Sequence, residues 1–121
     1  MATAEGKFSR RNRLLKPDEY RRVFDSGERS GDRNFMVLAR ANGLQYARLG
    51  LAITKKKTKR AVDRNRLKRL VRESFRSHQH LLTGMDLVVL NQRGKLLATN
   101  SQYYSSLSRH WQKLAKRCAR S

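Results

Sequence analysis

Apolar residues recur at helical spacing near the start of the chain. Pro17 and the two acidic residues after it are typical of a helix start, because proline fits the first turn and carboxylates favour the positive end of the helix dipole. Tyr20, Val23 and Phe24 then fall on one face, since they stand three and four residues apart. We expect Ser26-Gly27 to end this short helix.

Two longer helices are predicted further along the chain. Residues 61–80 carry the strongest helical pattern, and Thr83-Gly84 is expected to break it. A last helix is predicted over about residues 101–116. The expected buried stripes are Leu67, Leu70, Val71, Ser74 and Phe75 in the first of these helices, and Leu107, Trp111, Leu114 and Cys118 in the second.

Three stretches have the pattern of β-strands. Residues 35–40 are mainly apolar and precede an Asn42-Gly43 turn signal. Residues 48–54 alternate, so their large apolar side chains are expected to face the core and the small ones to leave a shallow floor on the other face. Residues 85–90 are almost continuously apolar, which is typical of a strand buried on both faces. The strand–helix–strand order predicts a parallel crossover.

We therefore predict an α+β fold in which helices pack on a single sheet. A length of 121 residues fits one domain, and no internal repeat or long linker divides the chain. We take residues 1–121 as one domain, with 1–7 as a flexible arm and 118–121 as a frayed tail.

The charge of the chain indicates a polyanionic partner. Twenty-nine Lys and Arg against nine Asp and Glu give a net charge of +20, which attracts nucleic acid or an anionic membrane. Nucleic acid is favoured, because no stretch combines a basic face with the broad apolar face of a membrane-surface helix. We expect a cytoplasmic protein with no membrane partner, since no apolar run approaches the length that spans a bilayer and a single cysteine fits a reducing compartment.

Basic residues concentrate in the middle of the chain, where residues 55–76 hold eleven Lys and Arg against two acids. One flank of the predicted helix collects five of them, with Asn65 beside them: Arg64, Lys68, Arg69, Arg72 and Arg76. Like charges so close together cost stability unless a polyanion neutralises them. The loop at 54–60 extends this positive surface to the helix start, where backbone N–H groups can also receive phosphate.

No protein active site and no metal site are predicted. A protein nuclease usually needs clustered carboxylates to hold metal ions, and the acids here are isolated. His110 stands alone, and the sequence has no zinc-site spacing, glycine-rich phosphate loop or Ser/His/Asp signature. We expect His78 and His80 to be solvated at the end of a helix and Cys118 to be a small core or surface residue.

Two aromatic residues suggest how a nucleic acid would be held. Tyr20 and Phe24 share a helical face and would line a groove floored by Ala52 and Thr54. Bases of extended RNA stack on such rings while cations hold the backbone. The alternative is that one or both rings belong to the core.

The basic helix carries a specific motif. Residues 64–76, which read Arg-Asn-Arg-Leu-Lys-Arg-Leu-Val-Arg-Glu-Ser-Phe-Arg, resemble the RNR signature of the bacterial ribonuclease P protein subunit. The resemblance covers nearly the whole chain. Its other matching parts are residues 13–15, Tyr20, Phe24, 48–51, 54–56, 85–89 and the predicted helix around Trp111.

The resemblance implies a fold and a function. The expected order is α-β-β-β-α-β-α, with three helices and a mixed sheet of about four strands, similar to the second domain of ribosomal protein S5. It implies a left-handed βαβ crossover, although the general rule is right-handed in about 98% of cases. The family protein assists a catalytic RNA that removes the 5′ leader of precursor tRNA by Mg²⁺-dependent hydrolysis. Chemistry and Mg²⁺ would then belong to the RNA, and no protein partner is required.

The resemblance also assigns residues by position. Contact with the catalytic RNA is expected at Lys55, Lys56, Arg64, Asn65, Arg66, Lys68, Arg69 and Arg72. Contact with the leader is expected at Tyr20, Phe24, Leu38, Ala52 and Thr54.

Two other interpretations stay open. The first is a ribosomal protein or another structured-RNA-binding protein with no role in cleavage. The second is a sequence-specific DNA-binding protein, although no helix-turn-helix spacing precedes the basic helix.

Overall fold

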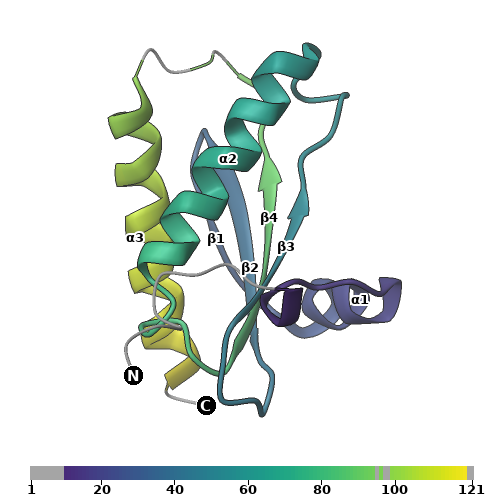
Figure 1. Cartoon of the computed structure of the whole chain (residues 1–121), viewed down its shortest axis with the longest axis vertical. Helices are drawn as coiled ribbons and strands as arrows, with labels where there is room; N and C mark the ends of the chain where they lie inside the picture. The colour runs from purple at the N-terminus through teal and green to yellow at the C-terminus, as the bar shows by residue number, and fades with distance from the viewer. Residues whose placement is uncertain (1–9, 95, 97–98, 120–121) are drawn as a thin grey trace.

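The computed structural model describes residues 10–94, 96 and 99–119. Within them three helices accompany a four-stranded sheet (Figure 1). The elements in chain order are the short 3-10 turn η2 (Arg10–Asn12), α1 (Pro17–Ser26), β1 (Glu28–Gly31), β2 (Phe35–Ala41), β3 (Arg48–Ala52), α2 (Ala61–Ser77), β4 (Met85–Asn91) and α3 (Asn100–Ala119). This order confirms the α+β fold and the α-β-β-β-α-β-α sequence of elements. The predicted arm at 1–7 lies outside the described residues.

The sheet is mixed, and its strands lie in the order β1-β2-β4-β3. β2 pairs antiparallel with β1 and with β4, whereas β3 pairs parallel with β4. In Figure 1, β3 and β4 both point upward, β4 lies to the left of β3, and α2 runs on the viewer's side of the sheet. The β3–α2–β4 crossover is therefore left-handed, as expected from the resemblance and against the general rule.

The side chains of β3 show why α2 lies on this face of the sheet. Leu49 and Leu51 pack in the core that α2 and α3 cover, whereas Gly50 and Ala52 point to the α1 side. A right-handed crossover would lay α2 on the two small residues and leave the large ones without a helix over them. The alternation predicted for this strand therefore suits the unusual handedness.

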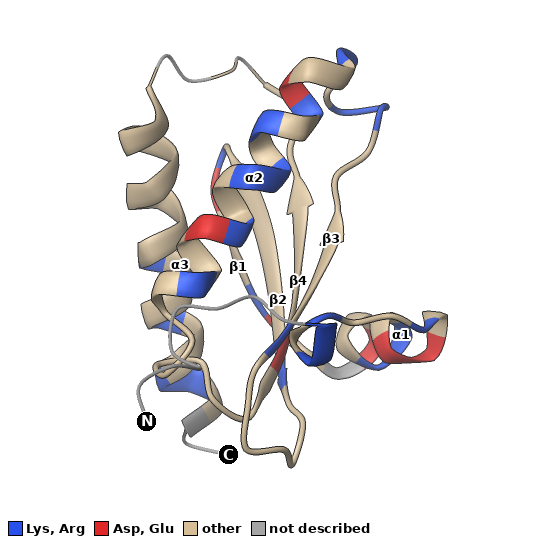
Figure 2. Ribbon diagram, in the orientation of Figure 1, with Lys and Arg blue, Asp and Glu red and all other residues tan. Residues whose placement is uncertain are grey.

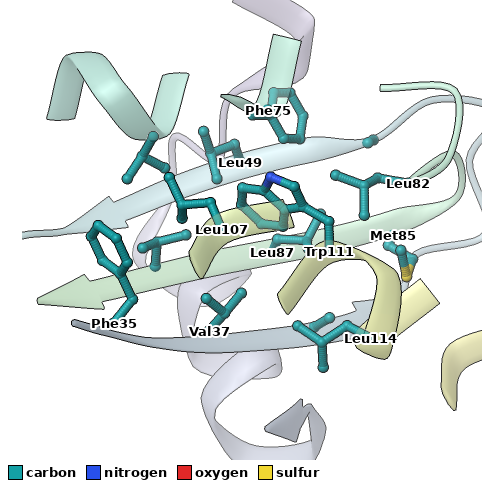
Figure 3. Packing of buried hydrophobic residues seen from close by; sticks show 14 of the residues in the cluster. Phe35, Val37, Leu49, Phe75, Leu82, Met85, Leu87, Leu107, Trp111 and Leu114 are labelled. Carbon is teal, nitrogen blue, oxygen red and sulfur yellow. The ribbon is translucent and has the colours of Figure 1, made fainter. Parts of the chain in front are cut away.

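Helices cover both faces of the sheet. The larger core lies under α2 and α3, where Phe35, Phe75 and Trp111 are fully buried (Figure 3). Ser74 belongs to the buried stripe of α2 because its hydroxyl accepts a 2.8 Å hydrogen bond from the indole N–H of Trp111. The smaller core lies under α1 and consists of Leu14, Val23, Leu38 and Val88.

β1 is the one strand that the apolar pattern did not predict, since Glu28–Gly31 holds no large apolar residue. It pairs as an edge strand and turns Ser30 toward α3, where the Ser30 hydroxyl lies 2.7 Å from Nδ1 of His110. Nε2 of the same ring lies 3.2 Å from Oδ2 of Asp32, outside good hydrogen-bond geometry. The prediction that His110 stands alone is therefore wrong.

Two predicted boundaries differ because of local polar contacts. α2 ends at Ser77 rather than at 80. His78 caps this helix, and its Nδ1 atom lies 2.7 Å from the carbonyl oxygen of Ser74. Because His78 is half-buried, it is not simply solvated as predicted. β3 ends at Ala52, because the backbone N–H of Thr54 donates to a side chain rather than to a neighbouring strand. At the other end of the chain, α3 reaches 119, inside the stretch predicted to fray. No helix in the described ranges is both long and apolar enough to span a bilayer.

Candidate nucleic-acid interface

Basic residues follow one another from the loop after β3 along α2 (Figure 2). We define the α2 basic surface by seven of the predicted RNA-contact residues: Lys55, Lys56, Arg64, Asn65, Lys68, Arg69 and Arg72. Arg64 and Lys68 are half-buried beside the apolar stripe, and the other five are exposed. The helical spacing predicted from the sequence therefore brings these seven residues together.

A buried amide shapes the lysine-rich loop. Asn91, at the end of β4, is 1% exposed and accepts a 2.9 Å hydrogen bond from the backbone N–H of Thr54. Its amide N–H groups donate to the carbonyl oxygen of Thr54 and to the hydroxyl of Thr58, at 2.9 and 2.8 Å. These bonds satisfy backbone groups that β3 leaves without a strand partner. Sequence reasoning missed this role, although a lone Asn closing an apolar strand was a usable signal.

Arg64 joins the loop to the first turn of α2. One of its guanidinium nitrogens, Nη1, donates to the carbonyl oxygens of Thr58 and Lys59 at 3.0 and 2.7 Å. A guanidinium carries five N–H donors, so Arg64 can hold the loop and still offer donors to a phosphate.

Arg66 lies on the other flank of α2, away from the α2 basic surface. Its Nε and Nη2 donate to the side-chain oxygen of Asn100 at 3.1 and 2.9 Å, and its guanidinium carbon lies 5.2 Å from the ring centre of Tyr103. A cation over an aromatic face is stabilised by the ring's negative charge distribution. The structure thus separates Arg66 from Arg64, which the sequence analysis had grouped together.

A cavity of about 250 Å³ opens at the β3 edge of the sheet. The segment before α1 forms one wall, because Leu14 donates its backbone N–H to Leu49 at 3.0 Å and Asn12 bonds to the carbonyl oxygen of Ala47. We call this cavity the β3-edge pocket, and it is lined by Arg13, Leu14, Leu15, Tyr20, Leu49, Leu51, Lys68 and Arg72. It joins an aromatic ring and apolar side chains to cations from two different elements.

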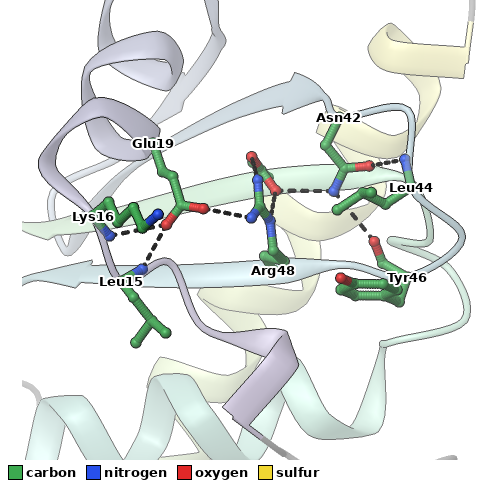
Figure 4. Close-up of polar contacts among 8 residues, drawn as sticks. Leu15, Lys16, Glu19, Asn42, Leu44, Tyr46 and Arg48 are labelled. Atoms are coloured by element: carbon green, nitrogen blue, oxygen red, sulfur yellow. Dashed lines mark hydrogen bonds and ion pairs between the residues drawn. The ribbon is translucent and has the colours of Figure 1, made fainter.

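An ion-pair network fixes α1 across the sheet (Figure 4). Arg48 donates to both carboxylate oxygens of Asp86 at 2.8 and 2.7 Å and to Glu19 at 2.6 Å. The other oxygen of Glu19 accepts the backbone N–H groups of Leu15 and Lys16. The Lys16 bond is the main cause that lowers the pKa of Glu19, and the Asp86 bond is the main cause that raises the pKa of Arg48.

The ring of Tyr20 packs directly on the backbone of Gly50. A Cβ atom at Gly50 would come within 2.6 Å of Cε1 of the Tyr20 ring, so only glycine leaves room for the ring at this depth. The small floor predicted for β3 is therefore partly filled by Tyr20 itself.

A row of half-buried residues crosses the sheet beside α1. Ala52, Leu90 and Met36 are register partners on β3, β4 and β2 and pack at the margin of the smaller core. Tyr20 packs at the same margin, and Phe24, which is 38% exposed, follows it by one helical turn on α1. We call these five residues the sheet-face surface. Met36 and Leu90 were missed, although strand alternation places them on the same face as Leu38 and Val88.

Thr54 and Leu38, the two remaining residues predicted to contact the leader, differ in their exposure to solvent. Thr54 is exposed just beyond β3. Leu38 is 2% exposed and lies in the smaller core under α1, so the structure offers little of its side chain to a leader, and the contact stays a prediction. Leu38 supports α1.

Comparisons with known proteins agree with one another. A family model described as Ribonuclease P matches residues 8–115. Proteins named ribonuclease P protein component are similar to this chain: that of Nitrosococcus oceani is 48% identical over 112 residues, covering 93% of this chain and 94% of that protein. One from Pseudomonas putida is 50% identical over 111 residues, covering 90% and 83%.

Solved structures give the same result. A Staphylococcus aureus RNase P protein mutant, described as having defective mRNA degradation activity, matches with a TM-score of 0.79 at 30% identity and covers 88% of this chain and 89% of that one. The RNase P protein from Thermotoga maritima matches with a TM-score of 0.65 at 30% identity, covering 87% and 96%. With the family model matching most of its length, the chain belongs to the ribonuclease P protein family.

Proposed function

We propose that this chain is the protein subunit of a ribonuclease P that matures the 5′ end of tRNA in the cytoplasm. In this proposal the α2 basic surface binds the catalytic RNA, and the sheet-face surface binds the single-stranded 5′ leader of precursor tRNA. The observation that carries the proposal is the β3-edge pocket, which is lined by Tyr20 of α1 and by Lys68 and Arg72 of α2. The chain's membership of the ribonuclease P protein family gives this pocket its meaning. Stacking rings beside phosphate-binding cations are what a single strand requires.

We assign the hydrolysis, and the Mg²⁺ it needs, to the RNA of the holoenzyme. In the described part of the chain no group of three His, Cys, Asp or Glu side chains is arranged to hold a metal ion. Glu19 and Asp86 are committed to Arg48, and Asp32 accepts hydrogen bonds from the hydroxyl of Ser106 and from two backbone N–H groups. This supports a protein that binds and positions, with metal ions held by RNA phosphates.

The charge explains how such a protein would assist cleavage. A catalytic RNA and a precursor tRNA repel each other through their phosphates, and a partner with a net charge of +20 lowers that repulsion. Holding the leader adds binding free energy on the substrate side only. We therefore expect tighter binding of leader-bearing substrate and a lower requirement for Mg²⁺.

Reconstitution tests this proposal. The chain is mixed with a bacterial catalytic RNA and precursor tRNA at low Mg²⁺, and leader removal is measured. We expect the wild-type chain to restore cleavage and Arg72→Gln to restore less than Arg21→Gln, an equally charged control on the exposed side of α1. Cleavage by the chain without the RNA would overturn the proposal. Co-sedimentation with ribosomes without leader removal would favour a ribosomal protein, and a preference for duplex DNA would favour a DNA-binding protein.

A second comparison tests the leader assignment. Phe24→Ala removes an exposed ring from the sheet-face surface, whereas Leu81→Ala removes an equally exposed apolar side chain (39%) from the turn after α2. We expect Phe24→Ala to weaken binding of precursor tRNA to the holoenzyme roughly 5- to 100-fold, since base–ring stacking is worth about 1–3 kcal/mol, and to leave mature tRNA unaffected. Equal losses for both ligands would remove Phe24 from the leader site.

A further inference from the structure

The C-terminal helix carries a second basic face that the proposed function leaves unused. From residue 87 to the end, the chain contains no Asp or Glu. Arg109, Lys113, Lys116 and Arg117 stand four, three and one residues apart, so they share one face of α3. All four are exposed.

This face is shaped and held in place. The four side chains and Gln112 line a surface depression of about 420 Å³. Arg117 donates from Nη1 to the backbone carbonyl of Arg29, which ties the end of α3 to β1. The apolar side of α3 is already buried, since Leu107, Trp111 and Leu114 are fully covered. A membrane-surface helix needs that apolar side free, so an anionic lipid surface is a poor fit.

Acidic neighbours do not neutralise the depression. Two described carboxylates, Asp32 and Glu28, face α3 from the β1 side. Glu73 of α2 also faces α3, beside Ser105 and Ser108, and it pairs with Arg76. Asp32 lies 3.9 Å from Arg109, and Glu28 lies near Cys118. Among the described residues no carboxylate pairs with Lys113 or Lys116. Four positive charges against two negative ones therefore leave a net attraction for anions.

Its place in the fold separates this face from the α2 basic surface. α3 packs over β1 and β2, whereas the β3-edge pocket lies at the opposite edge of the sheet. Three strand spacings of about 4.8 Å put the two edges roughly 14 Å apart. Figure 2 shows the basic residues of α3 gathered on its lower half, away from the loop after β3.

We propose that the face formed by Arg109, Lys113, Lys116 and Arg117 binds the phosphodiester backbone of a second structured-RNA segment. The protein then bridges two segments of RNA across its sheet, one on the α2 basic surface and one on α3. Phosphate contact fits the residues, because no described carboxylate pairs with Lys113 or Lys116 and the residues that line the depression include no aromatic ring for base stacking. The inference rests on the proposed function only in taking the catalytic RNA as the polyanion.

Tethered cleavage of the RNA locates each contact directly. The single cysteine is first removed by Cys118→Ser, and an iron chelate that produces hydroxyl radicals is attached in turn at Gln112→Cys, Asn65→Cys and Asp25→Cys. We expect the Gln112 and Asn65 reporters to cut the catalytic RNA of the holoenzyme at different nucleotides, and Asp25 on α1 to serve as background. Cuts from Gln112 no stronger than those from Asp25 would overturn the inference.

Charge variants give an independent test in a chain that keeps Cys118 and carries no chelate. Lys113→Gln with Lys116→Gln is compared with Arg21→Gln with Arg33→Gln, which removes the same charge from exposed positions elsewhere. The α3 variant removes two phosphate contacts, so we expect its plot of log affinity against log salt to be less steep by about 2. We expect a smaller change for the control variant. If the α3 variant has the same salt slope as the control, the bridging inference is overturned. Binding of the catalytic RNA by the wild-type chain would still support the proposed function in that case. If the wild-type chain does not bind the catalytic RNA, both fail.

Discussion

Arg48 lies between Glu19 of α1 and Asp86 of β4, with N–O distances of 2.6 and 2.7 Å. Its side chain is 18% exposed, so water screens the two ion pairs only partly. Asn42 donates a further hydrogen bond to Asp86 at 2.9 Å. One of the many positive charges in this chain therefore holds the fold together, and through α1 it positions Tyr20 and Phe24.

Removing the Arg48 guanidinium should destabilise the domain. Arg48→Gln leaves Glu19 and Asp86 without their charged partner, which we expect to lower the free energy of unfolding by about 2–3 kcal/mol. Arg21→Gln is the control, since its pair with Asp18 is exposed, and we expect a change of about 0–1 kcal/mol. Urea denaturation measures both. Similar losses for the two variants would contradict the role given to Arg48.

Glu19 makes part of this stability depend on pH. Because its pKa is lowered in the folded protein, chiefly by the backbone N–H of Lys16, the unfolded chain binds the proton more readily. The stabilisation is complete above the ordinary value of 4.5 and is lost as the pH falls through the native pKa. We expect the stability difference between wild type and Glu19→Gln to shrink from pH 7 to pH 3. A difference that stays the same from pH 7 to pH 3 would contradict this role of Glu19.

At the scale of elements, the loop between β3 and α2 is positioned by a side chain far from it in sequence. Asn91 bonds to Thr54 across 37 residues and to Thr58 across 33. Arg64 adds two bonds to the end of the same loop. The lysines of the loop therefore project from a fixed backbone rather than from a free linker, which reduces the entropy lost when they bind.

Removing the Asn91 amide should weaken RNA binding without changing any charge. We expect Asn91→Ala to lower the free energy of unfolding by about 1–3 kcal/mol, because buried loop groups lose their partners. The Thr54 amide should then exchange faster with solvent, and affinity for the catalytic RNA should fall. Gln92→Ala, next along the chain and half-buried, is the control. Unchanged exchange at Thr54 would show that the loop is held by something else.

At the scale of the whole molecule, much of the fold could be predicted because it depends on short-range spacing. The three helices follow from a period of 3.6 residues, the strand at 48–52 from a period of 2, and the strands at 35–41 and 85–91 from short apolar runs. β1 could not be found in this way, since its residues are polar and only its pairing with β2 makes it a strand. For the site, helical spacing alone grouped Arg64, Lys68 and Arg72. It could not show that Arg66 turns toward Asn100 or that Leu38 is covered by α1.

The net charge supports a prediction for the molecule as a whole. If 6–10 phosphates are contacted, affinity for the catalytic RNA should fall by about 10³–10⁵ between 50 and 200 mM salt, because each contact releases bound counterions. Equilibrium binding over a salt series measures the slope. A shallow dependence would mean that the basic surfaces are not where the RNA binds.

The sequence by itself determined the class of fold, the positive charge and the family signature at 64–76, because periodicity, composition and a contiguous motif are properties of neighbouring residues. Only the tertiary structure decided the β3-edge pocket and the placement of basic faces at opposite edges of the sheet. Each of these depends on contacts between residues distant in sequence, such as Asn91 with Thr54 or Ser30 with His110. Local patterns carry no information about which distant groups come to share a surface.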